Sequence, residues 1–170
     1  TFAGTPGVVL LLFRSALPGM VTQMRIAIGC DHGGFALKPE IRGVIEALGH
    51  ETLDVGTCSE DPVDYVDFAA GVARAVAGGQ ADLGVLICGT GIGMSIAANK
   101  VPGAYAARAE ECYSARMARL HNGANILCVG ARTTGPELAK EAVRTFLTTE
   151  PSPEERHARR RAQIRALEGR

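Results

Sequence analysis

Residues 85–100 read Val-Leu-Ile-Cys-Gly-Thr-Gly-Ile-Gly-Met-Ser-Ile-Ala-Ala-Asn-Lys. The apolar run 83–87 ends at Cys88, glycines follow at positions 89, 91 and 93, and a helical pattern covers 94–99. This order predicts a buried strand that carries Cys88 to its carboxyl end, beside the amino terminus of a helix. Free amide groups at such a turn bind anions and favour a thiolate, so one interpretation is proton abstraction from a substrate that becomes negative. The other is an inert core cysteine next to a structural glycine loop.

The composition is that of an ordinary globular protein. A length of 170 residues with 46% hydrophobic and 21% charged residues suits one domain with a sizeable core. The 18 basic and 18 acidic residues balance, and aromatic residues make up only 5%, so neither a nucleic acid nor a membrane surface is an expected partner. Five cysteines without a C-x-x-C pair fit neither a disulfide framework nor a zinc site, which favours a reducing, cytoplasmic location.

The first 23 residues differ from the rest of the chain. Their apolar run, residues 8–13, is too short to span a bilayer, and the flanking sequence lacks the features of a signal peptide. We expect residues 1–23 to be a disordered extension and residues 24–170 to form a single domain.

Strand and helix patterns alternate five times after Met24. The first, third and fifth predicted strands are short continuous apolar runs, typical of strands covered on both faces. The sequence therefore predicts a three-layer α/β/α sandwich around a five-stranded parallel sheet, a Rossmann-like fold. The expected strands are 25–30, 51–55, 83–87, 103–107 and 126–129, and the expected helices are 35–48, 65–77, 94–99, 110–120, 136–147 and 154–167.

Ligands of open parallel sheets bind beyond the carboxyl ends of the strands. We place Asp31-His32, the loop 88–93 and Asn99-Lys100 there, although Asp31 could instead cap the following helix. His121-Asn122 precedes the fifth strand and belongs at the opposite end. His121 is therefore either structural, as an ordinary helix end, or completes the site of a neighbouring subunit.

Two other patterns leave alternatives open. Arg156 and Arg160 share one face of the last helix, where they form either a phosphate clamp or a solvated basic surface. Asp54 stands where a dinucleotide-binding acid would be, but glycines 29, 33 and 34 do not form G-x-G-x-x-G. A nucleotide-dependent oxidoreductase is therefore disfavoured.

Residues 24–38, Met-Arg-Ile-Ala-Ile-Gly-Cys-Asp-His-Gly-Gly-Phe-Ala-Leu-Lys, closely resemble the amino terminus of the ribose-5-phosphate isomerase B family, which includes galactose-6-phosphate isomerase subunits. The resemblance covers about residues 24–168. Five further motifs follow the family pattern in order: 64–65, 87–93, 96–100, 121–122 and 156–157.

The resemblance implies an aldose–ketose isomerase that needs no cofactor or metal and works as a homodimer, or a pair of dimers, with sites at the subunit interface. By this analogy Cys88 moves the proton between C1 and C2, Thr90 assists proton transfer to the oxygens, and His121 opens the furanose ring from the partner chain. The last helix, 154–167, would contribute to the dimer and the phosphate site. The expected substrate contacts are Asp31, His32, Tyr65, Gly89, Gly91, Ile92, Gly93, Asn99, Asn122, Arg156 and Arg160.

Some family members carry a glutamate just after the glycine loop, where this chain has Met94, so Cys88 is the candidate base in the loop. The expected substrate is ribose 5-phosphate. The loop 56–62 departs from the family pattern, which leaves galactose 6-phosphate, allose 6-phosphate and tetrose phosphates as alternatives. A non-catalytic sugar-phosphate sensor is the rival from another class, and the presence of Cys88 speaks against it.

Overall fold

Five parallel strands form one sheet in the order β2-β1-β3-β5-β4, in a computed structural model that describes residues 22–169. The predicted disordered extension is residues 1–23, and of these residues 1–21 lie outside the described part of the chain. The parallel sheet confirms the predicted fold class. The strands are β1 (Arg25–Cys30), β2 (Glu51–Asp54), β3 (Leu83–Cys88), β4 (Ala106–Arg108) and β5 (Ile126–Gly130).

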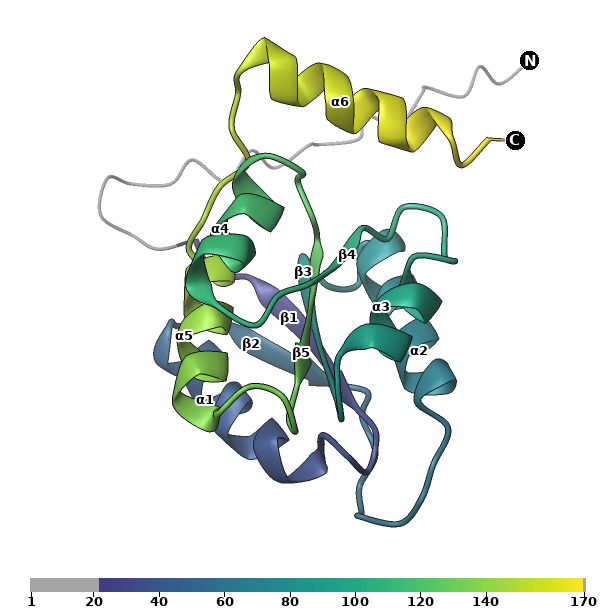
Figure 1. The fold of residues 1–170 in the computed structure, drawn as a ribbon, viewed down its shortest axis with the longest axis vertical. Coiled ribbons are helices and arrows are strands. Elements are labelled where there is room, and N and C mark those ends of the chain that lie inside the picture. Colours follow the sequence, from purple (N-terminus) through teal and green to yellow (C-terminus); the bar gives the residue numbers. More distant parts are fainter. Residues whose placement is uncertain (1–21, 170) are drawn as a thin grey trace, which may run out of the picture.

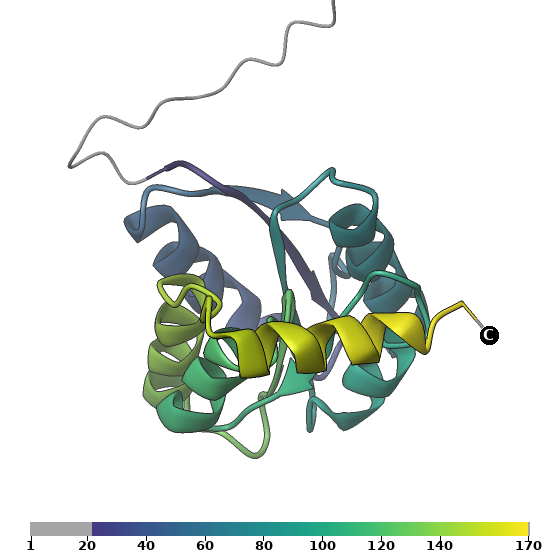
Figure 2. The ribbon, with the colours of Figure 1, turned by 90° about the horizontal axis from the view of Figure 1, so that it is seen from above.

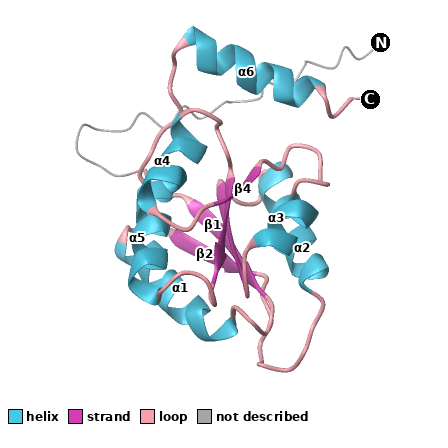
Figure 3. Ribbon diagram, viewed as in Figure 1, coloured by secondary structure: helices cyan, strands magenta, loops and turns pink. Residues whose placement is uncertain are grey.

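Helices cover both faces of the sheet and make the three layers seen in Figures 1 and 3. On one face lie α1 (Lys38–Ala47), α4 (Cys112–Leu120) and α5 (Pro136–Leu147), and on the other lie α2 (Tyr65–Ala77) and α3 (Ile92–Ala98). A short 3₁₀ turn, η1 (Phe35–Leu37), precedes α1, and Pro39 lies in the first turn of α1, where proline is favoured.

Successive residues of each strand feed two separate cores because side chains alternate across a sheet. Ile28 and Ile87 pack with α1 and α5, in a core that also contains the fully buried Phe146. Leu86 and Cys88 point to the other face, where they share a core with Met94 of α3. Cys88 therefore lies on the face that α2 and α3 cover.

The fourth strand is shorter and starts later than predicted. The side chain of Asn125 accepts a hydrogen bond from the Tyr105 amide (2.7 Å) and donates one to the Gly103 carbonyl (2.8 Å). Backbone groups that the pattern assigned to a strand are thus bound by a side chain, and the ladder with β5 begins only at Ala106.

The last helix, α6 (Glu155–Ala166), lies outside the layers. It crosses over the amino-terminal edge of the sheet, as Figure 2 shows from above. The Ser152 amide donates to the Leu120 carbonyl (2.8 Å), which fixes the segment before α6 to the end of α4. His157 is the only buried residue among those of α6.

Candidate active site

Three loops meet at the carboxyl edge of the sheet, after β1, β3 and β5. A Cβ atom added to Gly33 would lie 3.2 Å from the Gly89 amide nitrogen, so the first two loops are in contact. The Arg132 amide donates to the Gly89 carbonyl (2.9 Å), and the Ala131 amide donates to the Cys88 carbonyl (2.8 Å), which join the third loop to the second. The segments 31–34, 88–93 and 131–132 form what we call the carboxyl-edge cluster.

Cys88 lies at the centre of this cluster, with 5% of its surface exposed. Its Sγ atom accepts a hydrogen bond from the Gly91 amide (3.1 Å). Gly91 has a φ of 73°, a left-handed conformation that glycine adopts without strain, and it is the residue from which α3 begins. The turn therefore directs a backbone N–H at the sulfur, an arrangement that stabilises a thiolate.

Two other cysteines lie in the sheet and serve as a comparison. Burial raises the pKa of the Cys30 thiol to about 11, with partial compensation from the nearby Lys38. Burial also raises the pKa of the Cys128 thiol, and the neighbouring Cys88 adds to the effect. Neither of these two thiols is therefore suited to act as a base near neutral pH.

Two of the predicted sugar-binding residues, Asp31 and Tyr65, lie beside this loop. Asp31 is buried, and one of its carboxylate oxygens accepts a hydrogen bond from the Gly34 amide (3.0 Å), so it holds the turn that leads into η1 and α1. Its other oxygen makes no hydrogen bond to any of residues 22–169. The ring of Tyr65 packs on Gly93, where an added Cβ would come within 2.7 Å of it.

His32 ties the cluster to the loop between β2 and α2. Its Nδ1 accepts a hydrogen bond from the Val63 amide (3.2 Å), which places the ring proton of the neutral imidazole on Nε2. Nε2 is therefore a donor that a ligand can use.

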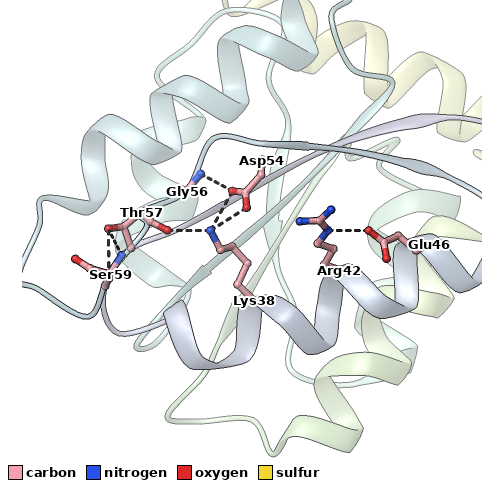
Figure 4. A network of polar contacts seen from close by, with 7 residues as sticks. All are labelled: Lys38, Arg42, Glu46, Asp54, Gly56, Thr57 and Ser59. Carbon is pink, nitrogen blue, oxygen red and sulfur yellow. Dashed lines mark hydrogen bonds and ion pairs between the residues drawn. The ribbon is translucent and has the colours of Figure 1, made fainter.

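The start of the same loop is held by a buried lysine (Figure 4). Lys38 Nζ lies 2.9 Å from a carboxylate oxygen of Asp54 and donates to the Thr57 carbonyl (2.8 Å). The Gly56 amide donates to the same carboxylate (2.9 Å). The loop is thus fixed at both ends, by Lys38 near β2 and by His32 near α2.

Two arginines of this region, Arg132 and Arg108, are not among the residues that the sequence predicted for the site. The Arg132 side chain lies against Gly89, with three guanidine-end atoms 3.5–3.6 Å from the place of an added Cβ. Arg108 Nε donates to the Thr90 carbonyl (2.5 Å), and its guanidinium pairs with Glu110. Each arginine stands at or just after the carboxyl end of a strand, β5 or β4, and that position is the signal that could have identified it.

A second group of predicted residues lies at the amino-terminal edge. His121 caps the carboxyl end of α4, and its ring stacks on His157 of α6 with centroids 4.2 Å apart. Asn122 is exposed beside it, and Arg156 and Arg160 are exposed on α6. Arg156 Nε pairs with Glu154 (2.7 Å). We call His121, Asn122, His157, Arg156 and Arg160 the amino-edge cluster.

The two clusters lie at opposite ends of the sheet within one chain. Cys88 pairs with Gly130 at the end of β5, whereas β5 begins at Ile126, just after the His121-Asn122 turn. Four residues of strand span about 13 Å. Within one chain, Cys88 and His121 therefore lie at opposite edges of the sheet, about the length of β5 apart.

Asn99 also lies apart from the carboxyl-edge cluster, contrary to its predicted place. A helix that follows a parallel strand runs back along the sheet, so the end of α3 lies far from its start. The Asn99 amide donates to the carbonyls of Ser95 and Ala106 (both 2.8 Å) and accepts from the Ala106 amide (2.9 Å). Its side chain holds α3 against β4 and makes no hydrogen bond to residues 88–93.

Within residues 22–169, no group of three or more His, Cys, Asp or Glu side chains is placed to hold a metal ion. None of the helices in the same range is both long and apolar enough to cross a membrane.

Comparison with known proteins relates these clusters to a family. Residues 26–164 match the model of the ribose/galactose isomerase family. Ribose-5-phosphate isomerase B of Escherichia coli is 48% identical over 146 residues, which cover 86% of this chain and 97% of that protein. D-erythrulose-4-phosphate isomerase 2 of Mycolicibacterium smegmatis is 40% identical over 150 residues, with 86% and 98% covered.

The fold comparison agrees with the sequence comparison. The structure of type B ribose 5-phosphate isomerase from Trypanosoma brucei superimposes with a TM-score of 0.83 at 49% identity, over 85% of this chain and 99% of that one. The family match spans all five strands and most of α6. The chain therefore belongs to the ribose/galactose isomerase family and is a sugar-phosphate isomerase.

Proposed function

We propose that the protein interconverts ribose 5-phosphate and ribulose 5-phosphate through an enediolate, with Cys88 as the base. The observation that carries this proposal is the Gly91 amide, which donates to the Cys88 sulfur at the carboxyl edge of the sheet. A thiolate held in this way is a base next to a loop that can stabilise negative charge. The relatives named as ribose-5-phosphate isomerases support the choice of substrate.

The reaction needs one proton to move between two neighbouring carbons. The Cys88 thiolate removes the proton from C2 of the open-chain aldose, the electron pair of that C–H bond forms the C1–C2 double bond, and the π pair of the aldehyde carbonyl moves to its oxygen. The backbone of residues 89–93 stabilises the resulting oxyanion, and Thr90 assists the transfer of the hydroxyl proton between the oxygens. Cys88 then returns its proton to C1, and no electrons are exchanged with a cofactor.

Substrate contacts follow from the chemistry of the surrounding groups. Asp31 and Tyr65 bind sugar hydroxyls through the free carboxylate oxygen and the phenol. His32 donates from Nε2 to the phosphate, together with Arg156 and Arg160. The exposed guanidinium of Arg132 adds a further positive group at the glycine loop. Asn99 has no part in this proposal because its side chain is engaged by backbone groups of α3 and β4.

The separation of the two clusters supports a homodimer in which each site combines the carboxyl-edge cluster of one chain with the amino-edge cluster of the other. His121 then opens the furanose ring, and Asn122 contacts the sugar, both from the partner chain. In such a dimer His121 can act on the same sugar as the partner's Cys88, whereas within one chain the two residues lie at opposite edges of the sheet. Pairing of dimers into a tetramer is compatible with the same sites.

A second candidate is the same chemistry on a different sugar phosphate. The relative from Mycolicibacterium smegmatis is named for erythrulose 4-phosphate, and the family description includes galactose. The loop between Asp54 and Tyr65 lies beside His32, so it contributes to the space available for the sugar. Its sequence departs from the family pattern, so this second candidate is a sugar phosphate with a carbon chain shorter or longer than that of ribose 5-phosphate.

The deciding experiment is an isomerisation assay of the purified protein, without added metal, on ribose 5-phosphate, allose 6-phosphate, galactose 6-phosphate and erythrose 4-phosphate. We expect the largest kcat/KM on ribose 5-phosphate. A preference for another sugar would retain the mechanism and replace the substrate. No isomerisation of any of the four by protein with reduced thiols would contradict the proposal and favour a sugar-phosphate sensor.

A further inference from the structure

His157 is an unusual residue for the helix that carries it. It is 5% exposed, on a helix whose other residues are exposed or half-buried. Its Nε2 atom is buried and has no hydrogen-bond partner among residues 22–169. The nearest carboxylate oxygen, Oε2 of Glu154, lies 3.9 Å away, which is beyond hydrogen-bond distance. Burial of an unpaired polar atom costs free energy, so a hydrogen bond of Nε2 is not the reason that this ring is buried.

The face of the ring provides that reason. The His157 and His121 rings are nearly parallel, with an interplanar angle of 4° and a centroid distance of 4.2 Å. Arg161 holds the two elements together, because its guanidinium donates to the His121 carbonyl (3.4 Å) and to the Ser152 carbonyl (2.9 Å). The His121 ring makes no hydrogen bond within residues 22–169, so the stack is the contact that sets the plane of its imidazole.

Burial, assisted by nearby positive charges, lowers the pKa of the His157 ring and so favours its neutral form. Burial lowers the pKa of His157, and His121, Arg156 and Arg160 lower it further, against the opposing effect of Glu154. A neutral His157 ring does not repel a proton on His121, whereas two imidazolium rings at this distance would repel each other.

We propose that His157 is a positioning residue that holds the His121 imidazole, through the stack, in the orientation required to open the furanose ring. This inference rests on the proposed function. When the ring opens, the C1–O4 bond breaks and its electron pair goes to O4, which receives a proton from His121. The C1 hydroxyl loses its proton to solvent, and the aldehyde forms. A ring free to rotate would meet O4 less often.

Ribulose 5-phosphate offers a test that separates ring opening from enediolate chemistry. It has no furanose form, because its C5 oxygen carries the phosphate. Exchange of its C1 proton with solvent deuterium therefore requires Cys88 but not His121. The experiment compares this exchange, followed by proton NMR, with the isomerisation of ribose 5-phosphate in the wild-type protein and in His121→Ala, His157→Ala and His157→Phe.

For His157→Ala we expect isomerisation to fall at least about tenfold, while C1 exchange stays within about twofold of wild type. His121→Ala should show the same split, and the double alanine variant should be no worse than His121→Ala alone. His157→Phe, which restores a flat ring without the nitrogen atoms, should recover most of the isomerisation. Thermal unfolding of each variant identifies any that does not fold.

Equal losses of isomerisation and exchange in His157→Ala, or no loss of either, would overturn the inference. So would a folded His157→Phe protein as impaired as His157→Ala, because the edge nitrogen would then be the active feature. Failure of the proposed function has a different signature: the wild-type protein would then neither isomerise ribose 5-phosphate nor exchange the C1 proton of ribulose 5-phosphate.

Discussion

The two edges of the sheet are built in different ways. The carboxyl-edge cluster consists of strand ends and loop backbone joined by hydrogen bonds, with the buried Cys88 at its centre. The amino-edge cluster depends on the docking of α6, a helix with one buried residue, and its arginines extend into solvent. The first region is therefore part of the sheet and its loops. The second region depends on a few contacts of α6, and substitutions can remove these contacts without disturbing the sheet.

The largest expected effect concerns the cysteine. Cys88→Ala should lower kcat by about 10³-fold or more, because it removes the base, while sugar phosphate still binds. Cys30→Ala is the matched control, since it truncates another buried thiol at the end of the neighbouring strand. Steady-state kinetics together with binding of an unreactive sugar phosphate measure the effect. Substantial turnover by Cys88→Ala would exclude the thiol as the base.

The second prediction tests whether the two clusters meet across a dimer. Cys88→Ala and His121→Ala should each be impaired on ribose 5-phosphate. After the two are mixed 1:1, unfolded and refolded together, random pairing into two-fold dimers should restore about a quarter of wild-type activity, because half of the dimers contain one intact site. The measurement is activity against mixing ratio. A mixture that stays at the sum of its two components would show that the clusters do not combine.

The third prediction compares the stability of alanine variants at two glycines, one in the carboxyl-edge cluster and one on the surface of α1. A Cβ on Gly34 would overlap the Ile87 carbonyl group, whereas one on Gly43 in α1 would meet no atom within 4 Å. Gly34→Ala should therefore destabilise the fold by about 1–3 kcal/mol. Gly43→Ala should stabilise it by about 0.5–1 kcal/mol, because alanine favours helix. Urea unfolding of both variants gives the difference, and equal free energies of unfolding would contradict the close approach of Gly34 to the end of β3.

The smallest effect concerns pH at the amino edge. The pKa of His157 is lower in the folded chain than its ordinary value of 6.5, chiefly because of burial. The unfolded chain therefore binds this proton at higher pH, and the contribution to stability, complete above pH 6.5, is lost as the pH falls towards the folded value. Unfolding free energies measured from pH 7.5 to pH 5 should decline less in His157→Phe than in wild type. Parallel curves would show that His157 does not cause the decline.

The pattern of the sequence predicts the sheet well because apolar runs and glycine stops are local properties. It misplaces the start of β4 because the side chain of Asn125, twenty residues after Tyr105, takes hydrogen bonds that local propensity assigns to the ladder. The loop around Cys88 was predictable for the same local reason. Arg132 and Arg108 were not predicted, although each stands at a strand end, because a lone arginine in a loop is an ordinary solvated residue.

Asn99 illustrates a different kind of error. The motif around it follows the family pattern, but a motif gives order along the chain and not position along the sheet. The course of α3 carries Asn99 to the opposite end, where Ala106 binds both groups of its amide. The stack of His121 on His157 joins residues 36 positions apart, a contact that no periodicity indicates.

The position of α6 in the chain orders events during synthesis. Among residues 22–169, the five strands and the helices that pack on the sheet precede Glu155, so the ribosome releases the material of the sandwich before it releases α6. The thiol and its loop can then assemble while the second imidazole of the stack is still being added. A nascent chain would thus pass through a stage in which the carboxyl-edge cluster is complete and His121 is present but not yet stacked, and the His121 ring would gain its stacking partner only when α6 docks.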